Sequence, residues 1–142
     1  MTISALIELN DSKVNIISLK QGGFCEVEFS QLYVFERVAT EHYEGWSYRA
    51  TLRLEHVSES AFKGMLLADD YVSDGHLFGP DGTDIAEKED VFTTSFSAPC
   101  TELTLLFGSG AFLSVKADKA SFCSVTRGEF VESWNGPLRS QV

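Results

Sequence analysis

The chain of 142 residues is poor in basic residues and cysteine, and has no long apolar run. Lys and Arg number 11 against 21 Asp and Glu, which gives a net charge of -10. Nucleic-acid binding needs clustered basic side chains, so direct binding of this kind is not expected. The three cysteines are odd in number and widely spaced, which excludes a disulfide framework. No stretch approaches the roughly 18 apolar residues that span a bilayer, so we expect no membrane partner.

The N-terminal sequence bears on the cellular location, and the surroundings of the cysteines bear on their burial. The first eight residues carry no base and no apolar run typical of a signal peptide, and we therefore expect a cytoplasmic protein. Cys25 and Cys123 lie in apolar, strand-like runs, where a free cysteine usually packs as a small hydrophobic residue. We expect both thiols to be buried.

Alternation of apolar and polar residues is the strongest local pattern. Residues 46–55 follow a period of two, with Trp46, Tyr48 and Ala50 on one side of the predicted strand and Ser47 and Arg49 on the other. Such alternation is typical of a half-buried β-strand. Residues 25–30 and 113–118 repeat the pattern, which makes the chain predominantly β.

Polar or glycine-containing breaks separate these runs, at residues 10–12, 21–23, 44–45 and 108–110. Helical patterns are weak: residues 58–66 could form one short helix, and a second could begin near Ala86. The prediction is one mainly β domain over residues 1–142, with at most two short helices. Its architecture is an antiparallel β-sandwich or a partly closed barrel of about 8–10 short strands.

An internal repeat is a further possibility. An offset of 88 residues aligns roughly residues 14–46 with 102–134, with 6 identities in the 25 positions from Gly22 to Trp46. One interpretation is an ancestral duplication of a β-meander. The other is that hairpins resemble one another in any β protein.

Negative charge is concentrated in residues 69–90. This acidic segment holds eight acids and one base, Lys88, and so carries -7 of the total charge of -10. It contains several turn dipeptides, and Asp74-Gly75 predicts a type I′ hairpin turn. The remainder of the segment is expected to be a loop on the β scaffold, which is where function often lies.

Three interpretations of the acidic segment remain open. It could dock a basic partner, because clustered carboxylates steer association and nearby aromatic residues supply apolar anchors. It could bind a cation, since four residues match a calcium loop, although neither Val72 nor Phe78 supplies the oxygen that the loop needs. It could simply be a solvated loop. The candidate partner-binding residues are Asp69, Asp70, Tyr71, Asp74, His76, Leu77, Phe78, Asp81, Asp84, Glu87, Glu89 and Asp90.

Catalytic and metal-binding motifs are missing from the sequence. It contains no H-E-x-x-H, C-x-x-C, G-x-S-x-G or phosphate-binding loop, so we predict no catalytic residue, no metal ligand set and no cofactor. The leading hypothesis is a non-enzymatic protein-binding domain, of the kind that bacterial immunity proteins and adaptors represent, which docks a basic protein through the acidic segment. The alternative is a β-barrel that binds a small molecule or a divalent metal ion.

Overall fold

The computed structural model describes residues 5–20, 22–85 and 97–135, and these form an antiparallel β-sheet without a helix. The predicted fold class is confirmed, although four strands are much longer than expected. The strands are β1 (Ala5–Lys20), β2 (Phe24–Ala39), β3 (His42–Glu55), β4 (Glu59–Lys63), β5 (Asp70–Phe78), β6 (Ser97–Pro99), β7 (Glu102–Phe107), β8 (Phe112–Lys116) and β9 (Lys119–Asn135).

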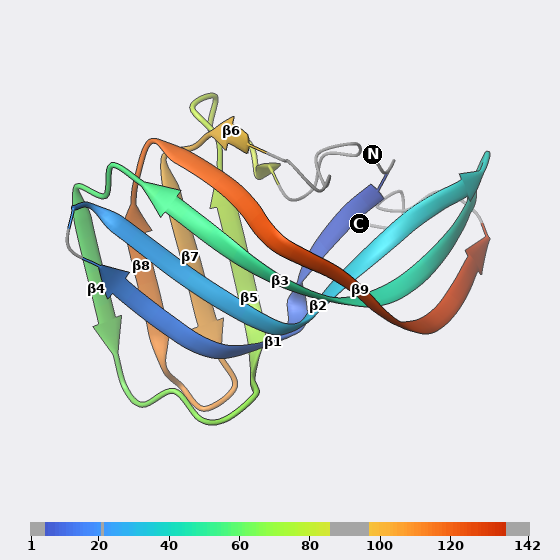
Figure 1. The fold of residues 1–142 in the computed structure, drawn as a ribbon, viewed down its shortest axis with the longest axis horizontal. Coiled ribbons are helices and arrows are strands. Elements are labelled where there is room, and N and C mark those ends of the chain that lie inside the picture. Colours follow the sequence, from blue (N-terminus) through green and yellow to red (C-terminus); the bar gives the residue numbers. More distant parts are fainter. Residues whose placement is uncertain (1–4, 21, 86–96, 136–142) are drawn as a thin grey trace.

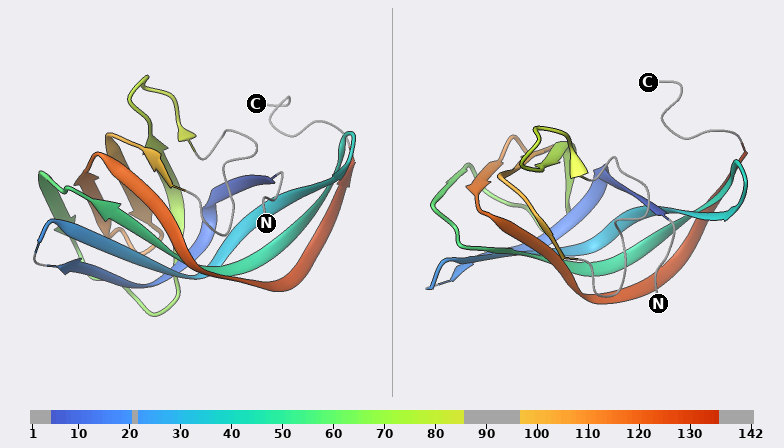
Figure 2. Two further views of the ribbon diagram at one scale, coloured as in Figure 1. Left: turned by 45° about the horizontal axis from the view of Figure 1, so that its top comes forward. Right: turned by 90° about the horizontal axis from the view of Figure 1, so that it is seen from above.

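The nine strands follow the order β4-β8-β7-β5-β1-β2-β3-β9-β6, and the sheet is not closed. β5 joins β1 through only two residue pairs, and there the sheet turns back on itself. As a result β4, β8, β7 and β5 cross one face of β1, β2, β3 and β9 (Figure 1). Beyond this two-layered body, the long strands continue as a curved extension formed by residues 5–10, 31–39, 42–49 and 126–135 (Figure 2).

The core is made by the alternating residues that the sequence pattern identified. In β2, Cys25, Val27 and Phe29 have no exposed surface, and they pair with β3 residues that include Leu52 and Leu54. Each apolar face is buried because the second layer covers it, and burial of apolar surface is the main stabilising term of such a fold.

Bulges allow the long strands to bend while keeping one face in the core. The register of β1 against β2 shifts after Glu8, and Asp11 has a φ of 69°. A shift between Phe29 and Leu32 in β2 moves burial from odd-numbered to even-numbered residues. An extra residue at a bulge changes which side chains point inward, so strict alternation read from the sequence fails there.

Two local predictions were wrong. Asp74-Gly75 is not a turn, because both residues lie within β5 and pair with Leu106 and Leu105 of β7, after a register shift at Ser73. An added Cβ at Gly75 would meet Leu9 at 3.0 Å, so the glycine serves close packing rather than chain reversal.

The helix predicted over residues 58–66 is also replaced by a strand, β4, which pairs with β8. Ser60 and Phe62 lie opposite the core residues Val115 and Leu113, and Gly64, with a φ of 86°, ends the strand region. Tertiary pairing overrides a weak helical pattern here. The second helix, predicted near Ala86, lies outside the described residues.

The predicted breaks had mixed outcomes. Residues 108–110 form the β7–β8 hairpin turn, which confirms that prediction. Residues 10–12 form a bulge within β1, and residues 44–45 continue through β3, so neither ends a strand.

The two segments of the possible duplication share one backbone feature. Gly22 and Gly110 have φ values of 90° and 93°, and each precedes a strand that starts with phenylalanine. The duplication itself stays a prediction.

The cysteines are not bonded to one another. Cys25 and Cys100 are buried, and this burial, with smaller effects of Glu26 and Asp118 respectively, raises the pKa of each thiol to about 11. Cys123, expected to be buried, is only half-buried. Trp134, at the end of β9, is 37% exposed.

Candidate functional site

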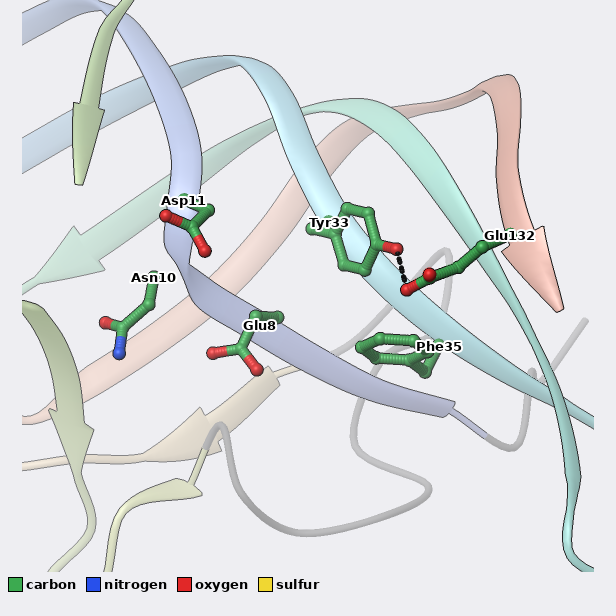
Figure 3. Close-up of a pocket in the computed structure, with 6 residues that line it drawn as sticks. All are labelled: Glu8, Asn10, Asp11, Tyr33, Phe35 and Glu132. Carbon is green, nitrogen blue, oxygen red and sulfur yellow. Dashed lines mark hydrogen bonds between the residues drawn. The ribbon is translucent and has the colours of Figure 1, made fainter. Parts of the chain in front are cut away.

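A half-open pocket of about 330 Å³ lies on the face of the extension that points away from the core. Residues from three strands line it: Glu8, Asn10 and Asp11 from β1, Tyr33 and Phe35 from β2, and Glu132 from β9 (Figure 3). We call this the outer-face pocket. It brings together three carboxylates and two aromatic rings that are up to 124 residues apart, from 8 to 132, in the chain.

The bulge in β1 supplies one wall of the outer-face pocket. The hydroxyl of Ser12 is buried, donates to the carbonyl of Glu8 at 2.6 Å and accepts from the backbone N–H of Tyr33 at 3.0 Å. The side-chain oxygen of Asn10 accepts from the N–H of Gly75 at 2.8 Å, which ties the bulge to β5. Asp11, between them, has the left-handed backbone that Asp and Asn tolerate best. The sequence Asn-Asp-Ser therefore shapes the wall locally.

The opposite wall depends on a glycine. The hydroxyl of Tyr33 donates to Oε1 of Glu132 at 2.7 Å and so connects β2 to β9 across β3, as Figure 3 shows. The residue beneath this bridge is Gly45, where an added Cβ would lie 2.7 Å from the hydroxyl oxygen of Tyr33. Only glycine lets the phenol ring lie this close to the strand.

The electrostatics of the outer-face pocket favour a cation. Burial, the hydrogen bond to Glu132 and the charges of Glu132 and Glu8 all raise the pKa of Tyr33, so the phenol stays protonated and keeps donating. Its edge contact with Phe35, at 4.9 Å between ring centroids, holds the two rings together. Carboxylates beside aromatic faces are a suitable environment for a guanidinium or ammonium group.

A second polar cluster lies on the core face of the extension. Glu36 is buried, accepts from the hydroxyl of Tyr48 and from Arg127 at 2.9 Å, and so links β2, β3 and β9. Arg127 also stacks on Trp46, with its guanidinium carbon 3.5 Å from the ring centroid. A buried charge needs such partners. This cluster holds the strands of the extension together from the side opposite the pocket.

The acidic segment, by contrast, directs two of its carboxylates, Asp70 and Asp84, into the protein. Asp70 is only 5% exposed and accepts from the N–H of Leu67 and from the N–H and hydroxyl of Ser109. Asp84 accepts from the N–H of Leu77 at 3.1 Å, and Leu77 belongs to the core. Asp70 and Leu77 lie inside the fold, where a docking partner does not reach them.

His76 forms an electrostatic cluster of its own within the acidic segment. Its ring lies 3.0 Å from Asp84 and 3.0 Å from Asp74, and stacks on Phe78. Burial opposes the protonated ring, but the hydrogen bond to Asp84 and the charge of Asp74 outweigh it, and the pKa of His76 is raised. Two of the predicted docking carboxylates, Asp74 and Asp84, therefore form ion pairs with the protonated ring of a histidine in the same segment.

Three of the other predicted partner-binding residues lie at the surface. Asp69, Tyr71 and Asp81 are exposed, and Asp81 accepts from the N–H and hydroxyl of Thr83. Glu87, Glu89 and Asp90 lie outside the described residues. The calcium-loop interpretation was wrong, because its first nine positions, Asp70 to Phe78, form the extended strand β5 and only the last three, up to Asp81, follow it. In the described ranges no three metal-binding side chains come close enough to hold an ion.

Sequence reasoning missed the outer-face pocket. Glu8, Tyr33 and Glu132 are separated widely in the chain, and each resembles an ordinary polar or aromatic residue of a strand. One signal was present: residues 10–12 interrupt an apolar pattern that resumes in the same strand, as a bulge does.

No family model, no curated protein and no solved structure matches the chain. Nor do the described residues contain a helix of the length and apolarity needed to cross a membrane.

Proposed function

We propose that this protein is a binding protein without catalytic activity, and that its outer-face pocket receives a cationic side chain of a basic partner protein. One observation carries the proposal: Glu8, Asp11 and Glu132 line one pocket together with the rings of Tyr33 and Phe35. The function class is the one the sequence favoured. The contact site differs from the one the sequence suggested.

Arginine suits the outer-face pocket better than lysine does. A planar guanidinium can pair with a carboxylate through two hydrogen bonds while its face lies on an aromatic ring. Glu132 is held in place by Tyr33, so a partner would meet a carboxylate that is already oriented. Preorganisation of this kind lowers the entropy lost on binding.

Negative charge outside the pocket would attract the same basic partner at longer range. A net charge of -10, with exposed Asp69 and Asp81 in the acidic segment, attracts a basic protein before contact is made. Attraction of this type acts over about 8 Å at physiological salt and mainly increases the association rate. The acidic segment would then steer a partner that the pocket holds.

A second candidate is a free small organic cation, such as an amine or guanidine. The volume of the outer-face pocket, about 330 Å³, favours it, because binding sites for small molecules begin at about 300 Å³. The same carboxylates and rings would hold this ligand.

An NMR titration with short peptides tests the proposal. The probes are a pentapeptide with one central arginine, its lysine counterpart, a peptide with uncharged citrulline, and free methylguanidine. We expect the arginine peptide to shift the backbone amide signals of Asp11 and Glu132, and the citrulline peptide to leave them unchanged. Equal shifts with citrulline would show that charge is not recognised. Tighter binding of methylguanidine than of the arginine peptide would favour the small cation.

Two matched variants separate the pocket from general negative charge. Asp11→Asn with Glu132→Gln removes two charges from the pocket, and Asp69→Asn with Asp81→Asn removes two from the acidic segment. We expect the pocket variant to bind the arginine peptide about tenfold more weakly, as for loss of an oriented ion pair. The segment variant should differ from the wild type by less than about twofold. The opposite ranking would return the site to the acidic segment.

A further inference from the structure

The edge strand β4 presents a free edge to the surroundings. It is the terminal strand of the sheet, and in the part of the chain that the structure describes it pairs with β8 alone. All five residues, Glu59 to Lys63, are exposed. An unpaired strand edge offers a row of backbone donors and acceptors to another strand.

Apolar surface lies directly beside this edge. A half-open groove of about 230 Å³ is lined by Ile17 and Leu19 from β1 and by Phe62 and Leu66. The end of β1 and the strand β4 lie at the same end of the two-layered body (Figure 1). Leu19 pairs with Cys25 and so points toward the core side of the sheet, yet it is 54% exposed. The core is therefore incompletely covered at this end.

The sequence of β4 is complementary to itself. In an antiparallel pair centred on Ala61, Glu59 of one copy lies opposite Lys63 of the other, and the two-fold axis generates a second such pair. Residues directly opposite one another project from the same face, so each pair of charges would meet. Ser60 would face Phe62 on the core side in the same way.

We propose that two copies of this chain associate through antiparallel pairing of their β4 strands, centred on Ala61. The two sheets then become continuous. Because the core faces lie on the same side of the joined sheet, the two apolar grooves meet across the axis and cover each other. Interfaces of this isologous type are the commonest in homo-oligomers.

Charge reversal tests the proposed register. Each copy carries a net charge of -10, so the oligomeric state of the full chain is measured by sedimentation at physiological salt, where repulsion is screened beyond about 8 Å. We expect a dimer that weakens about tenfold or more in Lys63→Glu or Glu59→Lys, since each places like charges opposite one another. The double variant Glu59→Lys with Lys63→Glu should restore dimerisation. Lys119→Glu, an equal charge change away from the edge, is the matched control.

Disulfide trapping gives a second readout. Ala61→Cys places two thiols across the axis, within the separation that a disulfide spans. We expect a covalent dimer under oxidising conditions, and none with Thr126→Cys. A chain that is monomeric at every concentration would overturn the proposal. A dimer whose dissociation constant is unchanged by the charge reversals would also overturn it. In the monomeric case, Lys63 blunts the edge instead.

Discussion

The acidic segment and the outer-face pocket are both rich in carboxylates, but they use them differently. In the acidic segment, Asp70 and Asp84 are engaged by backbone N–H groups, and Asp84 and Asp74 flank His76. In the pocket, Asp11 and Glu132 come from different strands and face a shared space. High charge density along a sequence therefore does not tell which carboxylates are accessible, because neighbouring carboxylates often serve local structure.

The largest difference between the two regions should appear in stability. Asp70→Ala removes a buried carboxylate that accepts hydrogen bonds from Leu67 and Ser109, and we expect it to lower the free energy of unfolding by about 2–3 kcal/mol. Asp11→Asn, at an exposed bulge whose left-handed backbone asparagine also adopts, should cost less than about 1 kcal/mol. Urea denaturation of both variants measures this. Equal losses would mean that the pocket carboxylate is structural too.

A smaller effect is expected at the floor of the pocket. Gly45→Ala forces the Tyr33 ring away from β3, and we expect about 1 kcal/mol of destabilisation together with loss of arginine-peptide binding. The closest contact is to the hydroxyl of Tyr33, so the same substitution should cost less in a Tyr33→Phe background. A double-mutant cycle by urea denaturation measures this coupling, and an additive result would contradict the close contact.

The smallest effect concerns pH and the acidic segment. The pKa of His76 is raised in the folded protein, so its ion pairs stabilise the fold fully below the ordinary histidine value of about 6.5. This contribution is lost as the pH rises through the raised pKa. We expect the stability difference between wild type and His76→Gln to be below about 1 kcal/mol and to shrink with increasing pH. Thermal denaturation across this range measures it, and a difference that grows with pH would be inconsistent with the cluster.

The fold class was predictable because its signal is local and repeated. Alternation over residues 46–55 identified the buried face of β3, where Tyr48, Ala50, Leu52 and Leu54 are all buried. The hairpin at residues 108–110 was equally readable from its glycines. Predictions failed at glycines, because glycine occurs both in turns and where two segments pack closely. Gly45 and Gly75 were interpreted as turn residues, whereas each permits close packing inside a strand.

The sequence by itself determined that the chain is acidic, that its strands alternate, and where several of its turns lie, because composition and periodicity act on neighbouring residues. Only the tertiary structure decided which strands pair, where they bulge, and which carboxylates meet. Glu8 and Glu132 line one pocket because the order β1-β2-β3-β9 places their strands on one curved sheet. Such a meeting depends on long-range register, and in this chain the bulge at positions 10–12 shifts the register of β1 against β2, with further shifts between β2 and β3 and between β3 and β9.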